Sequence, residues 1–392
     1  MPDKKLFLLT TALITIGIIC SYTLSAYTVI HFEYDNLHFV WRELLIAFIS
    51  IMFMWIISRL NPDIWLHRLG LALFWGSIVL MLIMPFLPSF LVNEVGGAKR
   101  WIKIVGFSLA PVEFFKIGFV YFLAWSFSRK LGHHGGMGLF QEFKRFAPYA
   151  SLFIMVMFLI AIVQNDLGQV VVLSLTLAIM LFFAGSSLRF FFSLIMGAVG
   201  FFLLFIAMAP HRMDRILSWW ASAQSTILAF FPESIAQHLR IANGEEAYQI
   251  GHSMNAIHNG GIWGTGLGNG TFKLGFLSEV HTDFVLAGIA EEFGFIGVLF
   301  VTFLFIALLH RLFKVANRSI EDIDYLFSLG IGLLITFAFM INAYGISGLT
   351  PIKGISVPFL SYGGSSMLAS SIGIGMVLML SKKIKYEPGD KR

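Results

Sequence analysis

Long apolar runs recur along the whole sequence, and they constrain its fold more than any other feature. A run of about 18 or more apolar residues is long enough to cross the hydrocarbon core of a bilayer as a helix. Of the 392 residues, 57% are hydrophobic and only 12% are charged. A soluble domain of this length would need more polar surface to face water. The sequence therefore predicts an all-α, polytopic integral membrane protein.

Ten apolar segments are long enough to be transmembrane helices. They lie at about 6–30, 39–58, 69–87, 111–128, 147–163, 168–185, 187–208, 283–310, 325–343 and 363–381. The sequence has no internal repeat and no separate soluble domain. We therefore expect residues 1–392 to form a single transmembrane domain, with one long loop, 209–282, between spans seven and eight.

The distribution of basic residues sets the orientation of the spans. An even number of spans places both termini on one side of the membrane, and most Lys and Arg residues of the short loops fall on that side. Cytoplasmic loops are enriched in Lys and Arg, so both termini should be cytoplasmic and the loop 209–282 extracytoplasmic. The net charge of +5 is explained by this asymmetry, and we expect no nucleic-acid partner.

Four basic residues in short outer loops run against this rule, and they are Lys99, Arg100, Lys103 and Lys353. Two interpretations remain open. Their side chains extend to lipid phosphates, or they bind an anionic substrate at the outer face. Trp101 lies beside two of them, and it is either an ordinary interfacial aromatic residue or a platform for a sugar or lipid headgroup.

Titratable residues also crowd before the eighth span, and they are Lys273, Glu279, His281 and Asp283. Such groups are costly at the mouth of a membrane helix and often mark a functional site. On a helix that turns by about 100° per residue, small residues share a face with Asp283, and they are Ala287, Ala290, Gly294 and Gly297. This stripe predicts close helix packing. Asp283 itself is either an N-cap or a functional carboxylate.

Other polar residues near the outer ends of spans have structural interpretations. Glu113 and Lys116 are spaced as an i,i+3 ion pair. Asp166 in the short connection QNDLG is either a turn cap or a functional group. Glu291 lies about two turns beyond Asp283 and is predicted to be a buried polar partner. The single Cys20 excludes an intrachain disulfide.

Five pieces of sequence resemble the SEDS family (shape, elongation, division and sporulation) in the family's order. They are GAKRW with PVEFFK, QNDLG, AYQIGHSMNAIHNGGIWGTGLGNG, LSEVHTDFVLAGIAEEFGFIG and TPIKGISVPFLSYGGSS. The string TPIKG resembles the division members more than the elongation members. The departures from the family pattern, which affect local loop detail, are Asn165, Gln169, His252 and His258.

The resemblance implies a peptidoglycan glycosyltransferase that polymerises lipid II, a disaccharide linked to undecaprenyl pyrophosphate. It implies action at the outer face of the bacterial cytoplasmic (inner) membrane, at the division septum, with a class B penicillin-binding protein and other division proteins as partners. By the family's pattern Asp283 is the essential carboxylate, and Trp101 and Lys353 are functionally important. No cofactor is required by this chemistry, although a divalent cation such as Mg²⁺ or Mn²⁺ is compatible with it.

We interpret Asp283 as the general base for the acceptor hydroxyl, with Lys353, Arg100 and Arg212 or Arg215 near the pyrophosphate. The candidate substrate-binding residues are Lys353, Trp101, Arg100, Lys99, Arg212, Arg215, Glu279, His281 and Ser365.

Two alternatives from other classes remain. A lipid II flippase should show repeat symmetry and interrupted helices near the midplane. A non-catalytic division scaffold would not need the outer Asp and Lys residues.

Overall fold

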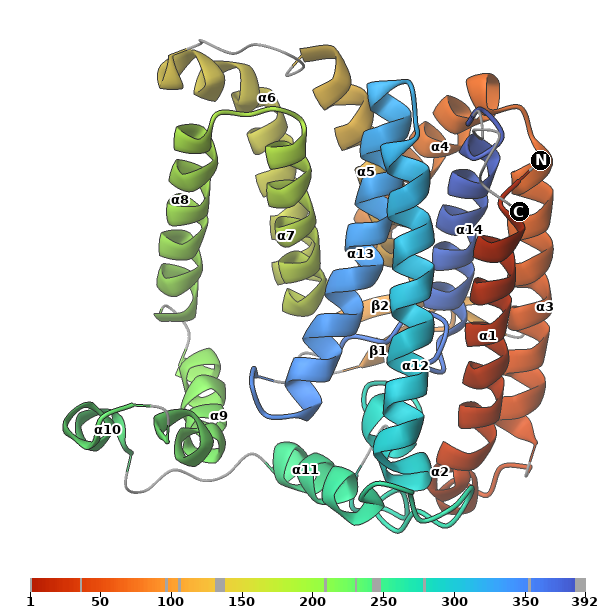
Figure 1. Ribbon diagram of the computed structural model, residues 1–392, viewed down its shortest axis with the longest axis vertical. Helices are drawn as coiled ribbons and strands as arrows, with labels where there is room; N and C mark the ends of the chain where they lie inside the picture. The colour runs from red at the N-terminus through yellow and green to blue at the C-terminus, as the bar shows by residue number, and fades with distance from the viewer. Residues whose placement is uncertain are drawn as a thin grey trace.

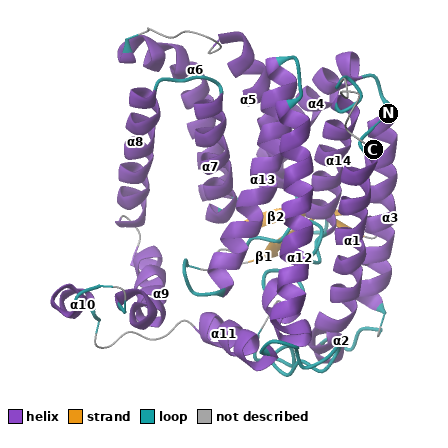
Figure 2. Cartoon of the chain, in the orientation of Figure 1, coloured by secondary structure: helices purple, strands orange, loops and turns teal. Residues whose placement is uncertain are grey.

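The protein is a mostly helical bundle (Figures 1 and 2). The computed structural model describes residues 2–35, 37–95, 98–104, 107–130, 138–207, 210–229, 231–241, 248–277, 280–351 and 354–384. Buried apolar side chains from almost all of the long helices form one continuous core.

Each of the ten predicted spans contains a long helix. These helices are α1 (Lys4–Leu24), α3 (His38–Arg59), α4 (Pro62–Ile83), α5 (Pro111–Lys130), α6 (Leu139–Phe158), α7 (Leu167–Phe183), α8 (Leu188–Ala207), α12 (Val285–Asn317), α13 (Asp322–Ile346) and α14 (Gly364–Leu380). In the described part of the chain, six helical segments are both long and apolar enough to cross a membrane, and α7, α8 and α14 contain shorter apolar stretches. Helix α5 is twenty residues long and contains the charged residues Glu113 and Lys116. The prediction of a polytopic helical membrane protein is confirmed.

The two ends of the chain meet at one end of the bundle (Figure 1). The Asp3 backbone N–H donates to Ser381 Oγ at 3.0 Å, just after α14. The Asp3 carboxylate caps α1 and also pairs with Arg311 of α12. The first helix, the eighth span and the last helix are therefore joined at this end, as an even number of spans requires.

A small antiparallel sheet precedes α5, and the all-α prediction did not include it. Its strands are β1 (Val92–Val95), β2 (Ala98–Ile104) and β3 (Phe107–Leu109), in the order β1-β2-β3. β1 and β3 have only four and three residues, and the seven residues of β2, AKRWIKI, do not alternate between apolar and polar, so the sequence shows no clear strand pattern. The sheet carries Arg100 and Trp101, so it determines where these two candidates lie.

Shorter helices gather mainly at the end of the bundle opposite the termini (Figure 1). They are α2 (Ala26–His31), α9 (Pro210–Leu228), α10 (Glu233–Leu239) and α11 (Tyr248–Gly260), while the short segments η1 (Met84–Phe86) and η2 (Leu159–Val163) extend α4 and α6. The loop between spans seven and eight is thus largely helical. It is tied to the segment after α13, because Trp219 Nε1 donates to Gly348 O at 2.8 Å and Ser253 Oγ donates to Ile346 O at 2.9 Å.

Helix α12 is broken one third of the way along its length. Gly294 has φ 68° and ψ −166°, which is not helical. The predicted small-residue stripe is therefore wrong beyond Ala290, because the turn at Gly294 removes the helical register that would align Gly297. Asp283 also lies before the helix, whose N-cap position is Phe284. The alternative in which Asp283 is the N-cap is not supported.

The glycine-rich run 259–270 fills this break. Backbone N–H groups of Thr265 and Gly266 donate to the carbonyls of Glu291 and Glu292, each at 2.9 Å, and Phe295 N donates to Gly261 O at 2.9 Å. The loop thus satisfies backbone groups that the interrupted helix leaves without helical partners, as burial requires.

Two adjacent glutamates of α12 fix the same loop through their side chains. Glu291 Oε1 accepts from the backbone N–H groups of Thr271 (2.6 Å) and Phe272 (3.0 Å) and from Asn259 Nδ2 (3.0 Å). Glu292 pairs with Lys273 at 2.6 Å, and both side chains are almost completely buried. The prediction that Glu291 is a buried polar partner is confirmed.

Gly294, where α12 meets the glycine-rich run 259–270, should be essential for stability. A Cβ on Gly294 would collide with Gly264 N and Ile262 O, and the positive φ adds strain. We expect Gly294→Ala to destabilise the detergent-solubilised protein by about 3 kcal/mol or more, measured as a lower thermal-unfolding midpoint. The matched control is Gly200→Ala in α8, where an added Cβ meets nothing within 4 Å. Equal midpoints for both variants would contradict the close approach.

The buried Lys273–Glu292 pair offers a second test of how α12 is joined to the segment before it. Breaking a buried pair leaves one uncompensated charge, so we expect Lys273→Met to lose about 3–5 kcal/mol. The double variant Lys273→Met/Glu292→Leu removes both charges and should recover most of that loss in the same melting experiment. A double variant no more stable than Lys273→Met would show that the pair is not the main contribution of these residues.

Candidate active site

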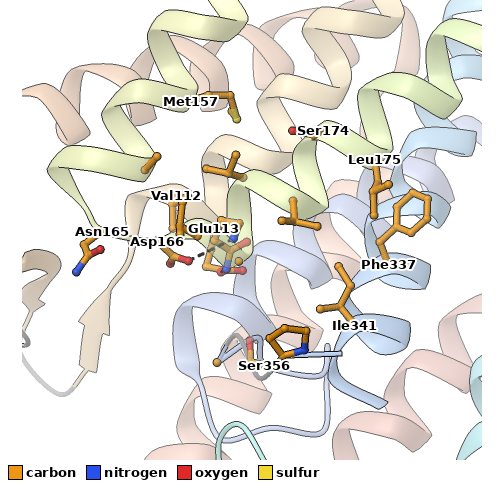
Figure 3. A pocket seen from close by; sticks show the side chains of 18 of the residues that line it. Val112, Glu113, Met157, Asn165, Asp166, Ser174, Leu175, Phe337, Ile341 and Ser356 are labelled. Carbon is orange, nitrogen blue, oxygen red and sulfur yellow. Dashed lines mark hydrogen bonds between the residues drawn. The ribbon is translucent and has the colours of Figure 1, made fainter. Parts of the chain in front are cut away.

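A cavity of about 2470 Å³ lies within the bundle and opens between its helices. Its walls come from α3, α5, α6, α7, α8, α9, α11 and α13, from the sheet, and from the turns before α12 and α14. Figure 3 shows a polar part around Glu113 and Asp166, with Met157, Leu175 and Phe337 further along the wall. One cavity thus combines charged groups with a long apolar surface.

Asp283 lies in the wall of this cavity, half-buried in the turn before α12. Asn342 Nδ2 of α13 donates to Asp283 O at 2.6 Å and to Ile355 O at 2.7 Å, which holds this turn against the segment after α13. The Asp283 Oδ2 atom lies 2.9 Å from the position of a Cβ on Gly354, whose φ is +57°. Only glycine at residue 354 lets the backbone approach this carboxylate without strain.

Trp101 and Arg100 of β2 also line the cavity, and the Arg100 guanidinium lies 5.8 Å from the Trp101 ring centroid. Arg100 is engaged with the protein itself. Its Nε donates to Gln164 O at 2.6 Å and its second nitrogen donates to Asn165 O at 2.8 Å. Arg100 therefore stabilises the carbonyl end of η2, where a cation is favoured.

Lys99 is bound to the backbone near η1. Its ammonium donates to Leu87 O at 2.8 Å and to Pro85 O at 3.1 Å, and it is not among the residues that line the cavity. The pairing of β1 with β2 shifts register at Arg100, because Asn93 pairs with Trp101 and Glu94 pairs with Lys99. Strict alternation of side chains therefore does not apply here.

The turn between η2 and α7 joins Arg100 to a chain of polar side chains. Asp166 is the N-cap of α7 and accepts from Gln169 N, which confirms the turn-cap interpretation of Asp166. Gln169 Nε2 donates to Glu113 Oε1 at 2.9 Å, and Glu113 pairs with Lys116 at 2.7 Å as predicted. Burial raises the pKa of the Asp166 carboxyl, while the Gln169 N–H and the charge of Arg100 lower it.

His281 and Ser365 hold elements together near the cavity. His281 is buried between the rings of Phe39 and Tyr362, at centroid distances of 5.2 and 5.6 Å, and does not line the cavity. Ser365 does line it, accepting from Ala110 N at 2.8 Å and donating to Ser108 O at 2.7 Å.

Four other candidates cannot be placed in the site. Lys353 and Glu279 lie outside the described residues. Arg212 and Arg215 fall in α9, but their side chains also lie outside what the structure describes. Within the described ranges, no group of three or more His, Cys, Asp or Glu residues is arranged to hold a metal ion.

The structure adds residues of α3 that the sequence did not nominate. They are Arg42 and Glu43, and both line the cavity. Their position in the sequence could have identified them, because two charged residues just inside the end of a membrane span are costly unless they face protein or a cavity.

These features define a class: a multi-pass helical membrane protein whose large cavity, partly polar and partly apolar, holds an aspartate on the side opposite the chain termini. A family model described as cell cycle protein, for FtsW, RodA and SpoVE, matches residues 4–386. The chain belongs to this family, the SEDS family, which confirms the resemblance found in its motifs.

Similar proteins cover nearly the whole chain. A probable peptidoglycan glycosyltransferase FtsW of Helicobacter pylori is 46% identical over 98% of this chain and 99% of its own length. Stage V sporulation protein E of Bacillus subtilis is 32% identical, covering 98% of both chains.

Two solved structures share the fold. RodA of Thermus thermophilus has a TM-score of 0.65 at 22% identity, covering 99% of both chains. A chain of a peptidoglycan synthase complex that coordinates polymerization and crosslinking has a TM-score of 0.72 at 23% identity, covering 98% of both chains.

The contacts of Arg100 predict a local effect of removing it. Arg100→Ala loses two charge-assisted hydrogen bonds, so we expect backbone hydrogen exchange in residues 164–169 to accelerate by about tenfold or more. Lys99→Ala is the matched control, because its bonds go to residues 85 and 87 instead. Equal protection of residues 164–169 in both variants would refute the bridging role.

Proposed function

We propose that this chain is a peptidoglycan glycosyltransferase that polymerises lipid II at the outer face of the bacterial cytoplasmic membrane during cell division. The observation that carries the proposal is Asp283, half-buried in the wall of a large cavity at the outer end of α12. The near full-length similarity to proteins named as probable peptidoglycan glycosyltransferases supports it.

In the proposed reaction Asp283 is the general base. Its carboxylate takes the proton from an acceptor sugar hydroxyl as that oxygen attacks the anomeric carbon of the donor. A new glycosidic C–O bond forms, the bond from the anomeric carbon to the pyrophosphate oxygen breaks, and the pyrophosphate leaves with the electron pair. Because pyrophosphate is a stable leaving group, this reaction needs no second carboxylic acid, unlike most glycosidases.

The shape and lining of the cavity suit a lipid-linked sugar. Its apolar wall includes Phe146, Phe153, Leu177, Leu181 and Leu194 from α6, α7 and α8. Apolar side chains that line a long groove can bind a hydrocarbon chain by packing against it. The polar part near Asp283 then receives the pyrophosphate and the sugars.

The leaving pyrophosphate is negative, so it needs positive charge beside it. Arg100 lines the cavity but donates to two backbone carbonyls. Lys353, which precedes Gly354 in the chain, and Arg212 or Arg215 are therefore the stronger candidates for holding pyrophosphate. A divalent cation, Mg²⁺ or Mn²⁺, is compatible with the same role.

A class B penicillin-binding protein is the proposed partner, together with other division proteins. The support is fold similarity to a chain of a peptidoglycan synthase complex that coordinates polymerization and crosslinking.

Replacing the proposed base tests the function. Purified protein with its penicillin-binding partner should form glycan chains from lipid II, and Asp283→Asn should reduce the rate by about 10²–10⁴-fold with an unchanged melting midpoint. Asp214→Asn, a second aspartate of the cavity wall, is the matched control and should stay close to the unsubstituted rate.

Two outcomes would contradict the proposal. A folded Asp283→Asn protein with full activity would exclude the general base. If the unsubstituted protein forms no glycan even with its partner, lipid II transport becomes the better hypothesis, and a flipping assay in vesicles tests it.

A further inference from the structure

One face of α3 forms part of the cavity wall. Phe39, Arg42, Glu43 and Ile46 all line the cavity, and their spacing of i, i+3, i+4 and i+7 places them on one side of a helix. Other side chains of α3, such as Trp41 and Phe48, are exposed on the outside of the bundle. The cavity-facing side is therefore distinct from the outward-facing side of the same helix.

This face of α3 packs against the turn that carries Asp283. The Phe39 ring lies 5.2 Å from the His281 ring and 5.1 Å from the Tyr362 ring, centroid to centroid. Tyr362 N donates to His281 O at 2.8 Å, and His281 is two residues before Asp283. Glu43 lies one helical turn beyond Phe39, so it belongs to the same region of the wall as Asp283.

Glu43 is buried in this wall, with 1% of its surface exposed, and its Oε1 atom has no hydrogen-bond partner among the described residues. The neighbouring Arg42 does not satisfy this oxygen either, because no hydrogen bond among the described residues joins it to Glu43 Oε1. A buried acceptor without a partner is costly, and native structures rarely retain one without a reason.

The chemistry of an unpartnered carboxyl limits what it can bind. Its oxygens accept hydrogen bonds from hydroxyl and amide N–H groups. Of the parts of a lipid-linked saccharide, only the sugars and their attached amides offer donors. The pyrophosphate and the hydrocarbon chain offer none.

We propose that Glu43 is a saccharide-binding residue, whose Oε1 accepts a hydrogen bond from a sugar hydroxyl or amide of the substrate beside Asp283. This inference rests on the proposed function, because it assigns one part of the same substrate to one residue. It separates the wall of the cavity into a sugar-binding side on α3 and an apolar side on α6 to α8.

The test measures binding rather than turnover. In an Asp283→Asn background, which cannot polymerise, lipid II and undecaprenyl pyrophosphate are titrated separately into the protein in nanodiscs. Glu43→Met, which keeps the length of the side chain but removes its acceptor, should weaken lipid II binding by about tenfold or more. Binding of undecaprenyl pyrophosphate, which has no sugar, should not change.

Thermal unfolding provides the second readout. Removing an unpartnered buried oxygen should leave the melting midpoint of Glu43→Met unchanged or raise it, whereas a purely structural Glu43 predicts a lower midpoint. Ser50→Ala is the matched control, because Ser50 is buried in the same helix, has an unpartnered Oγ and does not line the cavity. It should alter neither binding curve.

The possible results separate this inference from the proposed function. Unchanged lipid II binding by a folded Glu43→Met protein overturns the inference. An equal loss of affinity for both ligands also overturns it, and so does a lower melting midpoint accompanied by weaker binding of both. None of these results bears on polymerisation, which the unsubstituted protein reports. Selective loss of lipid II binding with retained stability supports the saccharide role.

Discussion

The break in α12 at Gly294 is the constraint on which the half of the structure opposite the chain termini depends. A helix interrupted at the edge of a bilayer leaves backbone donors and acceptors that lipid cannot satisfy. Here the run 259–270 supplies the missing partners, and Glu291 and Glu292 fix that run through their side chains. The long loop between spans seven and eight is therefore part of the folded core, not an appendage to it.

The same constraint explains why the proposed base is held from several directions. Asp283 stands between the filled break of α12 and the segment after α13, to which Asn342 ties its backbone. Tyr362, just before α14, bonds the same turn through His281. A carboxylate on a turn acquires a fixed position when segments distant in sequence converge on it, and a fixed position is what general-base catalysis requires.

The sequence predicted those features that depend on local composition. Apolar length located the ten spans, and short-range spacing identified the Glu113–Lys116 pair and the Asp166 cap. Features that depend on tertiary contacts were missed or wrong. The residues of the longest strand, AKRWIKI, do not alternate between apolar and polar, and the break at Gly294 is filled by a loop distant in sequence. The different partners of Lys99 and Arg100 depend on the sheet and its register shift, which no local pattern shows.

The contacts that join Asp3 to Arg311 and Ser381 have a consequence for biosynthesis. Asp3 precedes its partners Arg311 and Ser381 by 308 and 378 residues, so it is synthesised before either of them. During translation α1 is made before its capping carboxylate can pair with Arg311, and the bond to Ser381 forms only when α14 is in place. Completion of this contact therefore requires that α1, α12 and α14 are all inserted, and a chain truncated before residue 381 lacks it.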